Sequence, residues 1–128
     1  MALCREGRFA AVLEALFPVL IHPSRKGDTA IIDCMHRMAD DTGPEVFIRQ
    51  QTAIIARPDS TADLARIRCP TLVIVGDGDV PTPPERAKEI VDGIKGARLV
   101  TVPVCGHMSA IERPEAVTDA LVGWMQAG

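Results

Sequence analysis

Two aspartates, Asp77 and Asp79, and one histidine, His107, could form a carboxylate–imidazole pair for acid–base chemistry. Asp77 and Asp79 stand in a turn after one apolar run, and His107 stands in the loop after the next. A carboxylate that accepts the Nδ1–H of an imidazole fixes its tautomer and stabilises the imidazolium formed when Nε2 takes a proton. The alternative is that Asp79 only caps a helix and that His107 is an ordinary loop residue, since both types are common in turns.

The residues around these positions predict a β-α-β unit. Thr71–Val75 is a short β-branched run closed by Gly76, which predicts a strand buried on both faces, as in a parallel sheet. Pro84–Ile94 has apolar residues at helical spacing, and Ala97–Val102 predicts a second strand. Parallel strands joined by a crossover helix end at the same edge of the sheet, so the loops carrying the candidate acid and base should meet there.

The rest of the chain predicts helices. Residues 9–20 form one apolar stripe, in which Pro18 should weaken the last turn. Asp28 is placed to cap a second helix, and Thr42-Gly43-Pro44 should end it and begin a third. Residues 60–63 have the pattern of a capping box that opens a short helix. A last helix from about residue 114 is expected to bury Val117, Ala120, Leu121 and Trp124.

The order of these motifs resembles the C-terminal part of an α/β-hydrolase-fold protein. Residues 76–83, Gly-Asp-Gly-Asp-Val-Pro-Thr-Pro, are similar to the G-x-x-D-x-x-T/V-P motif that carries the acid in this family. Gly106-His107 is similar to the motif that carries its base, and Ser109–Val117 is typical of its last loop and helix. The resemblance implies that Asp79, and not Asp77, is the catalytic acid and that His107 is the base.

The resemblance also implies a division of the chain and an activity. Residues 1–58 are similar to the helical lid, and residues 59–128 to the C-terminal part of the α/β core. The expected fold is therefore α/β, a C-terminal fragment with two parallel strands and flanking helices. The implied reaction is hydrolysis of an ester, lactone or related acyl bond in a small-molecule substrate, without a cofactor. The fold does not fix the substrate.

The sequence departs from the family pattern at the nucleophile. It contains no G-x-S-x-G elbow, and none of its serines, Ser24, Ser60 and Ser109, lies between small residues after a strand. We therefore expect a truncated hydrolase, inactive by itself, whose serine lies in a missing N-terminal half. Two strands also leave two unpaired sheet edges. A second interpretation thus stays open: a non-catalytic remnant or interaction module that completes its sheet as a homodimer.

Other polar residues carry weaker functional signals. Cys105, close to His107, is either a reactive thiol or, as we favour, a small residue that fills the loop. His22 and His36 have no partners at metal-ligand spacing, so no metal is expected. Gly76-Asp77-Gly78 lacks the glycines of a dinucleotide fingerprint. The methionines Met35, Met38 and Met108 are expected in packing, or along an apolar substrate pocket.

Composition narrows the class of protein. The formal charge is -3 and no run of like charges occurs, so neither nucleic acid nor an anionic membrane is an expected partner. The longest apolar stretch is interrupted by Glu14 and Pro18 and is too short to span a bilayer. The four widely spaced cysteines fit neither a zinc site nor a disulfide framework. With no secretory signal expected, the sequence predicts a soluble cytoplasmic protein.

Overall fold

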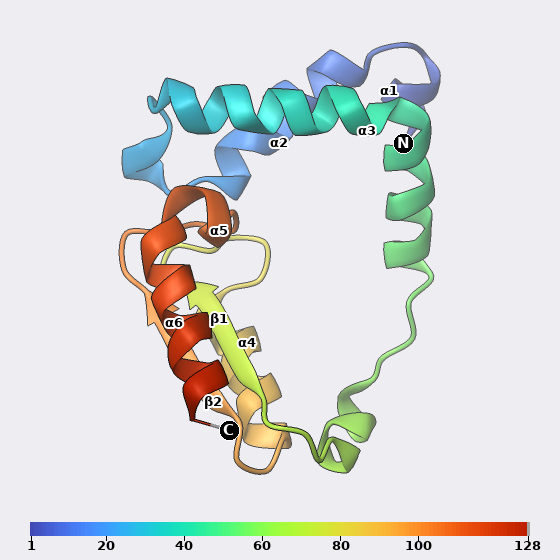
Figure 1. Ribbon diagram of the computed structural model, residues 1–128. Helices are drawn as coiled ribbons and strands as arrows, with labels where there is room; N and C mark the ends of the chain where they lie inside the picture. The colour runs from blue at the N-terminus through green and yellow to red at the C-terminus, as the bar shows by residue number, and fades with distance from the viewer. Residues whose placement is uncertain (128) are drawn as a thin grey trace.

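The computed structural model describes residues 1–127. These form a helical segment followed by a β-α-β unit and two C-terminal helices (Figure 1). The elements in chain order are α1 (Ala2–Arg5), α2 (Phe9–Leu20), the 3₁₀ turn η1 (Pro23–Arg25), α3 (Thr29–Ile55), the 3₁₀ turn η2 (Thr61–Arg66), β1 (Leu72–Gly76), α4 (Pro84–Gly93), β2 (Arg98–Val102), α5 (Ser109–Glu112) and α6 (Pro114–Gln126).

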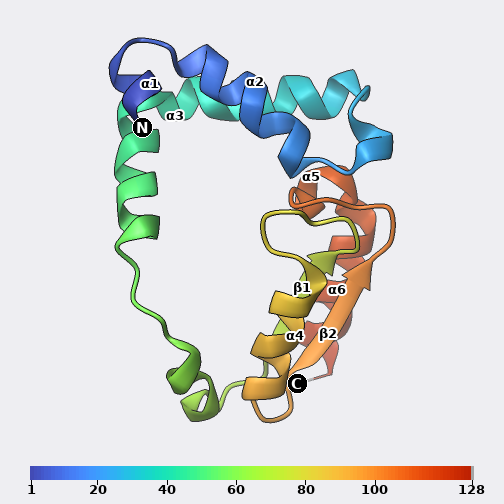
Figure 2. The same ribbon diagram turned by 180° about the vertical axis from the view of Figure 1, so that it is seen from behind.

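The helical segment has its own hydrophobic core. The apolar stripe of α2 packs on α3. Figure 2 shows the two helices side by side, seen from behind. The buried members of this core are Leu13, Phe17, Ile21, Ile31 and Met35. Met108 and Ile111, from the loop after β2 and from α5, pack against the same core although they lie far away in the sequence. The helical segment and the end of the sheet are therefore joined by apolar contacts.

Sequence signals at the start and in the middle of α3 act as predicted. The Asp28 carboxylate accepts the N–H groups of Ala30 and Ile31, which satisfies free donors of the first turn. Gly43 interrupts the helix with φ 70° and ψ 164°, a conformation open to glycine, and Pro44 starts a new helical direction. Figure 1 shows the resulting sharp bend between the two halves of α3. The predicted second and third helices are these two halves.

The capping-box prediction at residues 60–63 is wrong. Ser60 makes no side-chain cap hydrogen bond, and the short helix that follows is the 3₁₀ turn η2. The preceding Asp59 takes that role, because its Oδ1 accepts the backbone N–H of Thr61 at 2.9 Å and the Thr61 hydroxyl at 2.6 Å. Asp59 and Thr61 thus form an Asx turn that competes with the expected cap.

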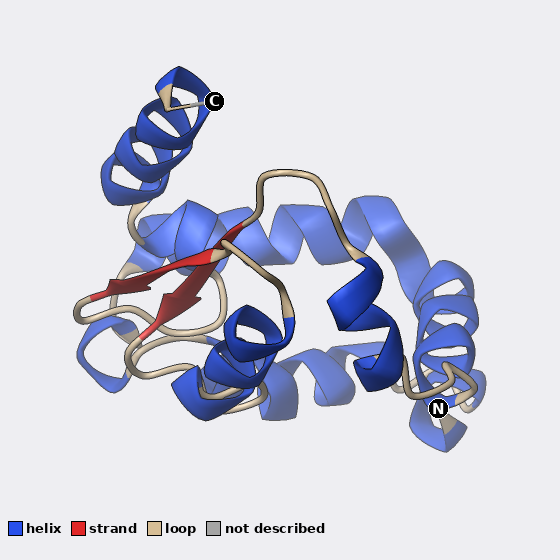
Figure 3. Cartoon of the chain, turned by 90° about the horizontal axis from the view of Figure 1, so that it is seen from below, coloured by secondary structure: helices blue, strands red, loops and turns tan. Residues whose placement is uncertain are grey.

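The β-α-β unit is a parallel pair of strands crossed by α4. β1 and β2 run in register from Leu72 opposite Arg98 to Gly76 opposite Val102. Both α4 and α6 contact the strands, and Figure 3 shows them on opposite sides of the sheet. This places the turn after β1 and the loop after β2 at one edge, as the sequence predicts.

Burial in this unit is lower than predicted. In β1 only Val75 and Gly76 are buried, and no residue of α6 is; Leu121, for example, is 42% exposed. The expected two-faced burial of β1 and the expected burial of the α6 stripe are therefore wrong for this chain. The physical reason is the width of the sheet, because two strands present too little surface to cover a helix on each face.

Candidate functional site

The turn after β1 is hydrogen-bonded to the loop after β2. The Asp77 N–H donates to the carbonyl of Val102 at 3.0 Å, and the Gly78 N–H donates to the carbonyl of Cys105 at 2.8 Å. A Cβ at Gly76 would overlap the carbonyl oxygens of Cys105 and Gly106, so the two loops approach as closely as glycine allows. This contact sets the distance between the candidate acid and base.

Asp79 is a buried carboxylate held in a fixed orientation. Its Oδ1 accepts the backbone N–H of Thr82 at 2.9 Å, and its Oδ2 accepts the Thr82 hydroxyl at 3.0 Å. Only 6% of its side chain is exposed. Asp79 thus closes the turn before α4 but does not cap that helix, which begins after Pro83 without a side-chain cap. Both carboxylate oxygens also have a further partner.

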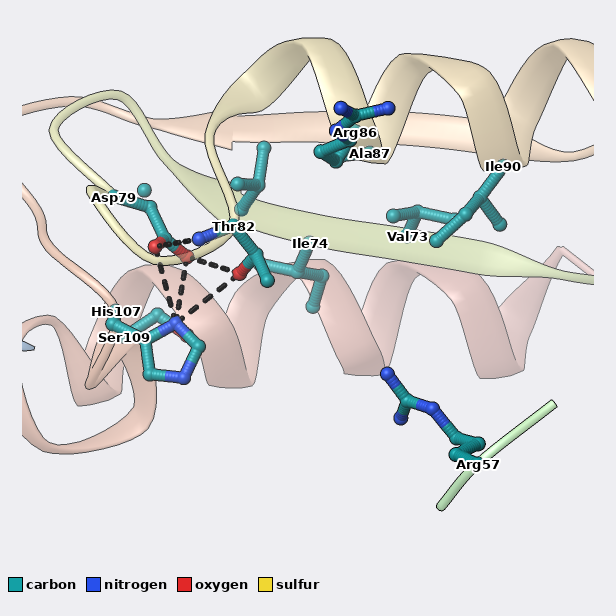
Figure 4. Close-up of a pocket in the computed structure, with 12 residues that line it drawn as sticks. Arg57, Val73, Ile74, Asp79, Thr82, Arg86, Ala87, Ile90, His107 and Ser109 are labelled. Atoms are coloured by element: carbon teal, nitrogen blue, oxygen red, sulfur yellow. Dashed lines mark hydrogen bonds and ion pairs between the residues drawn. The ribbon is translucent and has the colours of Figure 1, made fainter. Parts of the chain in front are cut away.

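That partner is the ring of His107. Its Nδ1 lies 2.9 Å from Oδ2 and 3.1 Å from Oδ1 of Asp79, and 3.2 Å from the Thr82 hydroxyl (Figure 4). Because an ionised carboxylate only accepts, Nδ1 carries the proton, and Nε2 of a neutral ring is left as the acceptor. Side-chain exposure of His107 is 36%, so the ring is half open. The structure therefore brings together the two residues that the sequence selects.

The Asp77 carboxylate binds the backbone of the loop after β2 and not the His107 ring. Its Oδ1 accepts the N–H of Cys105 at 3.1 Å. Backbone N–H groups of Cys105 and Val104 hold the pKa of Asp77 below its usual value, because they stabilise the charged form. Asp77 is thus a turn residue, as predicted.

The thiol of Cys105 is buried and unreactive in character. Its exposed fraction is 0%, and burial, with the nearby Glu112 carboxylate, raises the pKa of Cys105 from 9.0 to about 11. Only the thiolate is strongly nucleophilic, so at neutral pH this cysteine is a packing residue. The four cysteines are all free.

The remaining candidates lie apart from the acid–histidine pair or have structural partners. Nδ1 of His22 binds the Ser24 hydroxyl at 2.8 Å within one turn. His36 lies with its ring edge against Phe17, with a centroid distance of 4.9 Å. Ser109 lines the same cavity as His107 but begins α5, two residues along the same loop. Within residues 1–127, no three His, Cys, Asp or Glu side chains converge as metal ligands.

Two further residues, Thr82 and Glu112, hold the acid and the histidine loop in place, and the sequence did not predict these roles. Thr82 binds the Asp79 carboxylate through both its N–H and its hydroxyl. Glu112 is 2% exposed and accepts the N–H groups of Gly106 and His22, each at 2.9 Å. Both lie inside motifs that the resemblance covers, but a threonine in a turn and a glutamate before a helix give no signal of their contacts.

The cavity beside the pair runs along β1. It has a volume of about 380 Å³ and passes from Asp79 and His107 past Val73 and Ile74 to Ile90 of α4 (Figure 4). Consecutive residues of β1 line it and no residue of β2 does, so the cavity follows the edge of β1 that is not paired with β2. A second, apolar pocket of about 230 Å³ lies between α2 and α3 and includes Met35, Met38 and Met108. Met35 is also buried in the core of the helical segment, so the structure fits packing and pocket lining alike.

A parallel β-α-β unit with polar residues at the carboxyl ends of its strands defines a protein of the open α/β-sheet class. A family model described as TAP-like protein, an α/β-hydrolase model, matches residues 47–128. This chain belongs to the α/β-hydrolase family. The predicted fold class is thereby confirmed.

Solved structures of this family match nearly the whole chain. A thermophilic esterase from Thermogutta terrifontis is 31% identical with a TM-score of 0.89, over 98% of this chain and 46% of the esterase chain. The enol-lactonase from Burkholderia xenovorans LB400 is 25% identical with a TM-score of 0.87, over 98% of this chain and 48% of its own.

Among curated relatives, the 2-hydroxy-6-oxo-6-(2'-aminophenyl)hexa-2,4-dienoic acid hydrolase of Metapseudomonas resinovorans is 27% identical over 117 residues. That match covers 86% of this chain and 39% of the relative. The chain thus spans less than half the length of each of these three proteins. No helix within residues 1–127 is long and apolar enough to cross a membrane.

Proposed function

We propose that this chain supplies the acid and the general base of a serine hydrolase that cleaves an ester, lactone or related acyl bond. The observation that carries the proposal is the Asp79–His107 pair, with Nδ1 of the ring 2.9 Å from the carboxylate. Among residues 1–127, every hydrogen bond of the His107 ring runs through Nδ1. Nε2 is therefore left to accept a proton from a nucleophile.

The proposed mechanism has two acyl-transfer steps. Nε2 of His107 takes the proton of a serine hydroxyl as its oxygen attacks the acyl carbon, and then gives that proton to the leaving alcohol. Water, deprotonated by the same nitrogen, attacks the acyl-serine, and the nitrogen returns that proton to the serine oxygen as the carboxylic acid product leaves. Asp79 stays ionised and stabilises the imidazolium. Thr82 holds Asp79 in place throughout, through its two hydrogen bonds.

The serine, in this proposal, comes from polypeptide outside these 128 residues. The cavity along the unpaired side of β1 supports this. A further parallel strand placed there would have its carboxyl end at the same end of the sheet as the His107 loop. A sharp turn after that strand is where a nucleophile elbow places its serine. The oxyanion hole must come from the same polypeptide.

We propose the helical segment, residues 1–58, as a lid that binds the acyl part of the substrate. Its apolar pocket between α2 and α3 includes Met108, the residue after His107, and so reaches the loop that carries the proposed base. Apolar walls suit a hydrocarbon chain. Two of the matched structures are named an esterase and an enol-lactonase, and both names denote hydrolysis of acyl bonds. This supports the same substrate class here.

The test is ester hydrolysis by the 128-residue chain and by the longest natural polypeptide that contains it. We expect negligible turnover of an activated ester by the chain alone, since an acid–base pair without nucleophile or oxyanion hole loses most of the rate enhancement. The longer polypeptide should be active and should label on an upstream serine with a fluorophosphonate. Robust turnover by the chain alone that His107→Ala abolishes would overturn the proposal that the serine lies outside these residues.

A second candidate function is a homodimeric, non-catalytic module, which the unpaired edge of β1 favours. Two copies could pair their β1 strands and so satisfy the free backbone groups. Light scattering after size exclusion separates the candidates. A stable dimer of the 128-residue chain supports the module, and a monomer with a cooperative melt contradicts it.

A further inference from the structure

Glu112 is a buried carboxylate that joins the histidine loop to the helical segment. It is 2% exposed, and its Oε1 accepts the N–H of Gly106 while its Oε2 accepts the N–H of His22, both at 2.9 Å. A buried charge is costly unless hydrogen bonds satisfy it. Each oxygen is satisfied by a different segment of the chain, 90 residues apart for His22 and 6 for Gly106.

The two segments that Glu112 binds enclose the backbone of His107. Gly106 directly precedes the histidine, and on its other side the N–H groups of His107 and Met108 donate to the carbonyl of Leu20, at 2.9 and 3.3 Å. Thus the end of α2 holds one side of the loop directly and the other side through Glu112. A Cβ on Gly106 would lie 2.6 Å from the His22 nitrogen and 2.8 Å from Glu112 Oε1, so these groups are in close contact.

Further contacts hold Glu112 and α5 against the helical segment. Arg25 donates from Nη1 to the Glu112 carbonyl at 3.0 Å, and its Nη2 forms an ion pair with Asp28 at 2.8 Å. Met108 and Ile111 pack on the core of the helical segment. Glu112 does not line the cavity that contains Asp79 and His107, so it touches neither substrate nor reacting atoms in the proposed reaction.

We propose that Glu112 is a positioning residue for His107, which holds the imidazole within reach of Asp79 only while the helical segment is docked. One carboxylate binds Gly106 and His22 together, so loss of the His22 contact also loosens the peptide before the base. The placement of His107 therefore depends on the helical segment. The catalytic meaning of this contact rests on the proposed function, but the geometric claim does not.

The test is nuclear magnetic resonance of the 128-residue chain, comparing the unmodified protein with Glu112→Gln. Glutamine has the same size but one acceptor oxygen, so its NH₂ group faces one of the two N–H donors. We expect the Nδ1–H signal of His107 to broaden or disappear, and amide exchange of Gly106 and His22 to rise by more than about tenfold. Glu115→Gln, an exposed carboxylate at the start of α6, is the matched control and should change neither.

A folded Glu112→Gln variant that keeps the His107 signal of the unmodified protein would overturn the proposal, because a merely structural role lowers the melting temperature without moving that signal. If this variant does not fold, Glu112→Asp keeps two acceptor oxygens and should recover part of the His107 signal.

In the unmodified chain, the Gly106 and His22 amides and the His107 Nδ1–H should exchange through one common opening. A Nδ1–H that persists while both amides exchange freely contradicts the inference. None of these readouts uses ester hydrolysis, so failure of the proposed function is seen separately.

Discussion

At the residue scale, the carboxylate of Asp79 has three donors around its two oxygens: the Thr82 N–H, the Thr82 hydroxyl and the His107 Nδ1–H. Two of these come from the turn that Asp79 itself begins. The carboxylate is thus oriented before the histidine loop contacts it, and the loop adds only one donor. Such preorganisation is what an acid that orients an imidazole requires.

Asp79→Asn tests this orientation by changing charge and not shape. The asparagine amide can present a donor to Nδ1 and so favour the wrong tautomer of His107. In the active longer polypeptide we expect kcat to fall by about 10⁴-fold. Asp77→Asn is the matched control two residues away; it keeps an oxygen for the Cys105 N–H, and we expect kcat to fall by less than about tenfold. Equal losses in the two variants would contradict the assignment.

The raised pKa of Cys105 gives a pH dependence of stability. In the unfolded chain the thiol ionises near 9.0, whereas in the folded chain it stays protonated to about 11. Between these values the unfolded state binds fewer protons, so the contribution of Cys105 is complete below pH 9 and declines as pH rises toward 11.

We expect the free energy of unfolding of the unmodified chain to lose on the order of 2 kcal/mol more than that of Cys105→Ala over this interval. Urea titrations at pH 8.5 and 10.5 measure the difference. The control is Cys69→Ala at an exposed cysteine, which should follow the unmodified protein. Parallel pH profiles for Cys105→Ala and the unmodified chain would show that the thiol is not shielded.

At the element scale, the close approach of the two loops depends on Gly76 at the end of β1. A Cβ there meets backbone oxygens of Cys105 and Gly106, which cannot move aside as a flexible side chain can. We expect Gly76→Ala to destabilise the chain by about 1–3 kcal/mol or more. Chemical denaturation provides the measurement.

Gly123→Ala is the control for Gly76→Ala, because Gly123 lies inside α6 with nothing within 4 Å of an added Cβ. Alanine is the better helix former, so this variant should gain up to about 1 kcal/mol. The opposite signs of the two substitutions are the sharp part of the prediction. A neutral Gly76→Ala would mean that the loops are more loosely joined than the structure indicates.

The predicted helices and strands follow from local patterns, and their bounds lie within a residue or two of the predictions. The short elements α1, η1 and α5 were not predicted. The bend at Gly43 and the cap at Asp28 are local chemistry, which a sequence displays. The meeting of the Asp77–Asp79 turn with the His107 loop was predictable, because the topology of a parallel pair brings them together. The choice of Asp79 over Asp77 came from the family resemblance. The role of Glu112 was not predictable, because its two partners come from segments whose docking no local pattern records.

Burial was the other failure, and it has the same origin. The β-branched pattern of β1 and the stripe of α6 are suited to a wider sheet, whereas a two-stranded sheet leaves Leu121 42% exposed. The apolar pattern of a strand or helix indicates how deeply it could be buried in a wider sheet, and not how deeply it is buried in this chain. The excess apolar surface therefore supports the proposal that a further strand is a neighbour of β1.

At the scale of the whole molecule, that neighbour should cover the cavity along β1. Ile90, on α4, lines this cavity and is 39% exposed, and Met125, near the end of α6, is outside it and 65% exposed. Lysine at either position stays in water in the 128-residue chain, so we expect both substitutions to shift its melting temperature by only about a few degrees.

In the longer polypeptide the two positions should differ. If a strand and its nucleophile loop cover the cavity, a lysine at position 90 is buried without a partner, which costs several kcal/mol. We expect Ile90→Lys to lower the melting temperature and ester hydrolysis strongly, and Met125→Lys to leave both nearly unchanged. Calorimetry and an activated-ester assay measure the two quantities. Equal tolerance of both lysines would mean that the open edge of β1 is not where the rest of the enzyme binds.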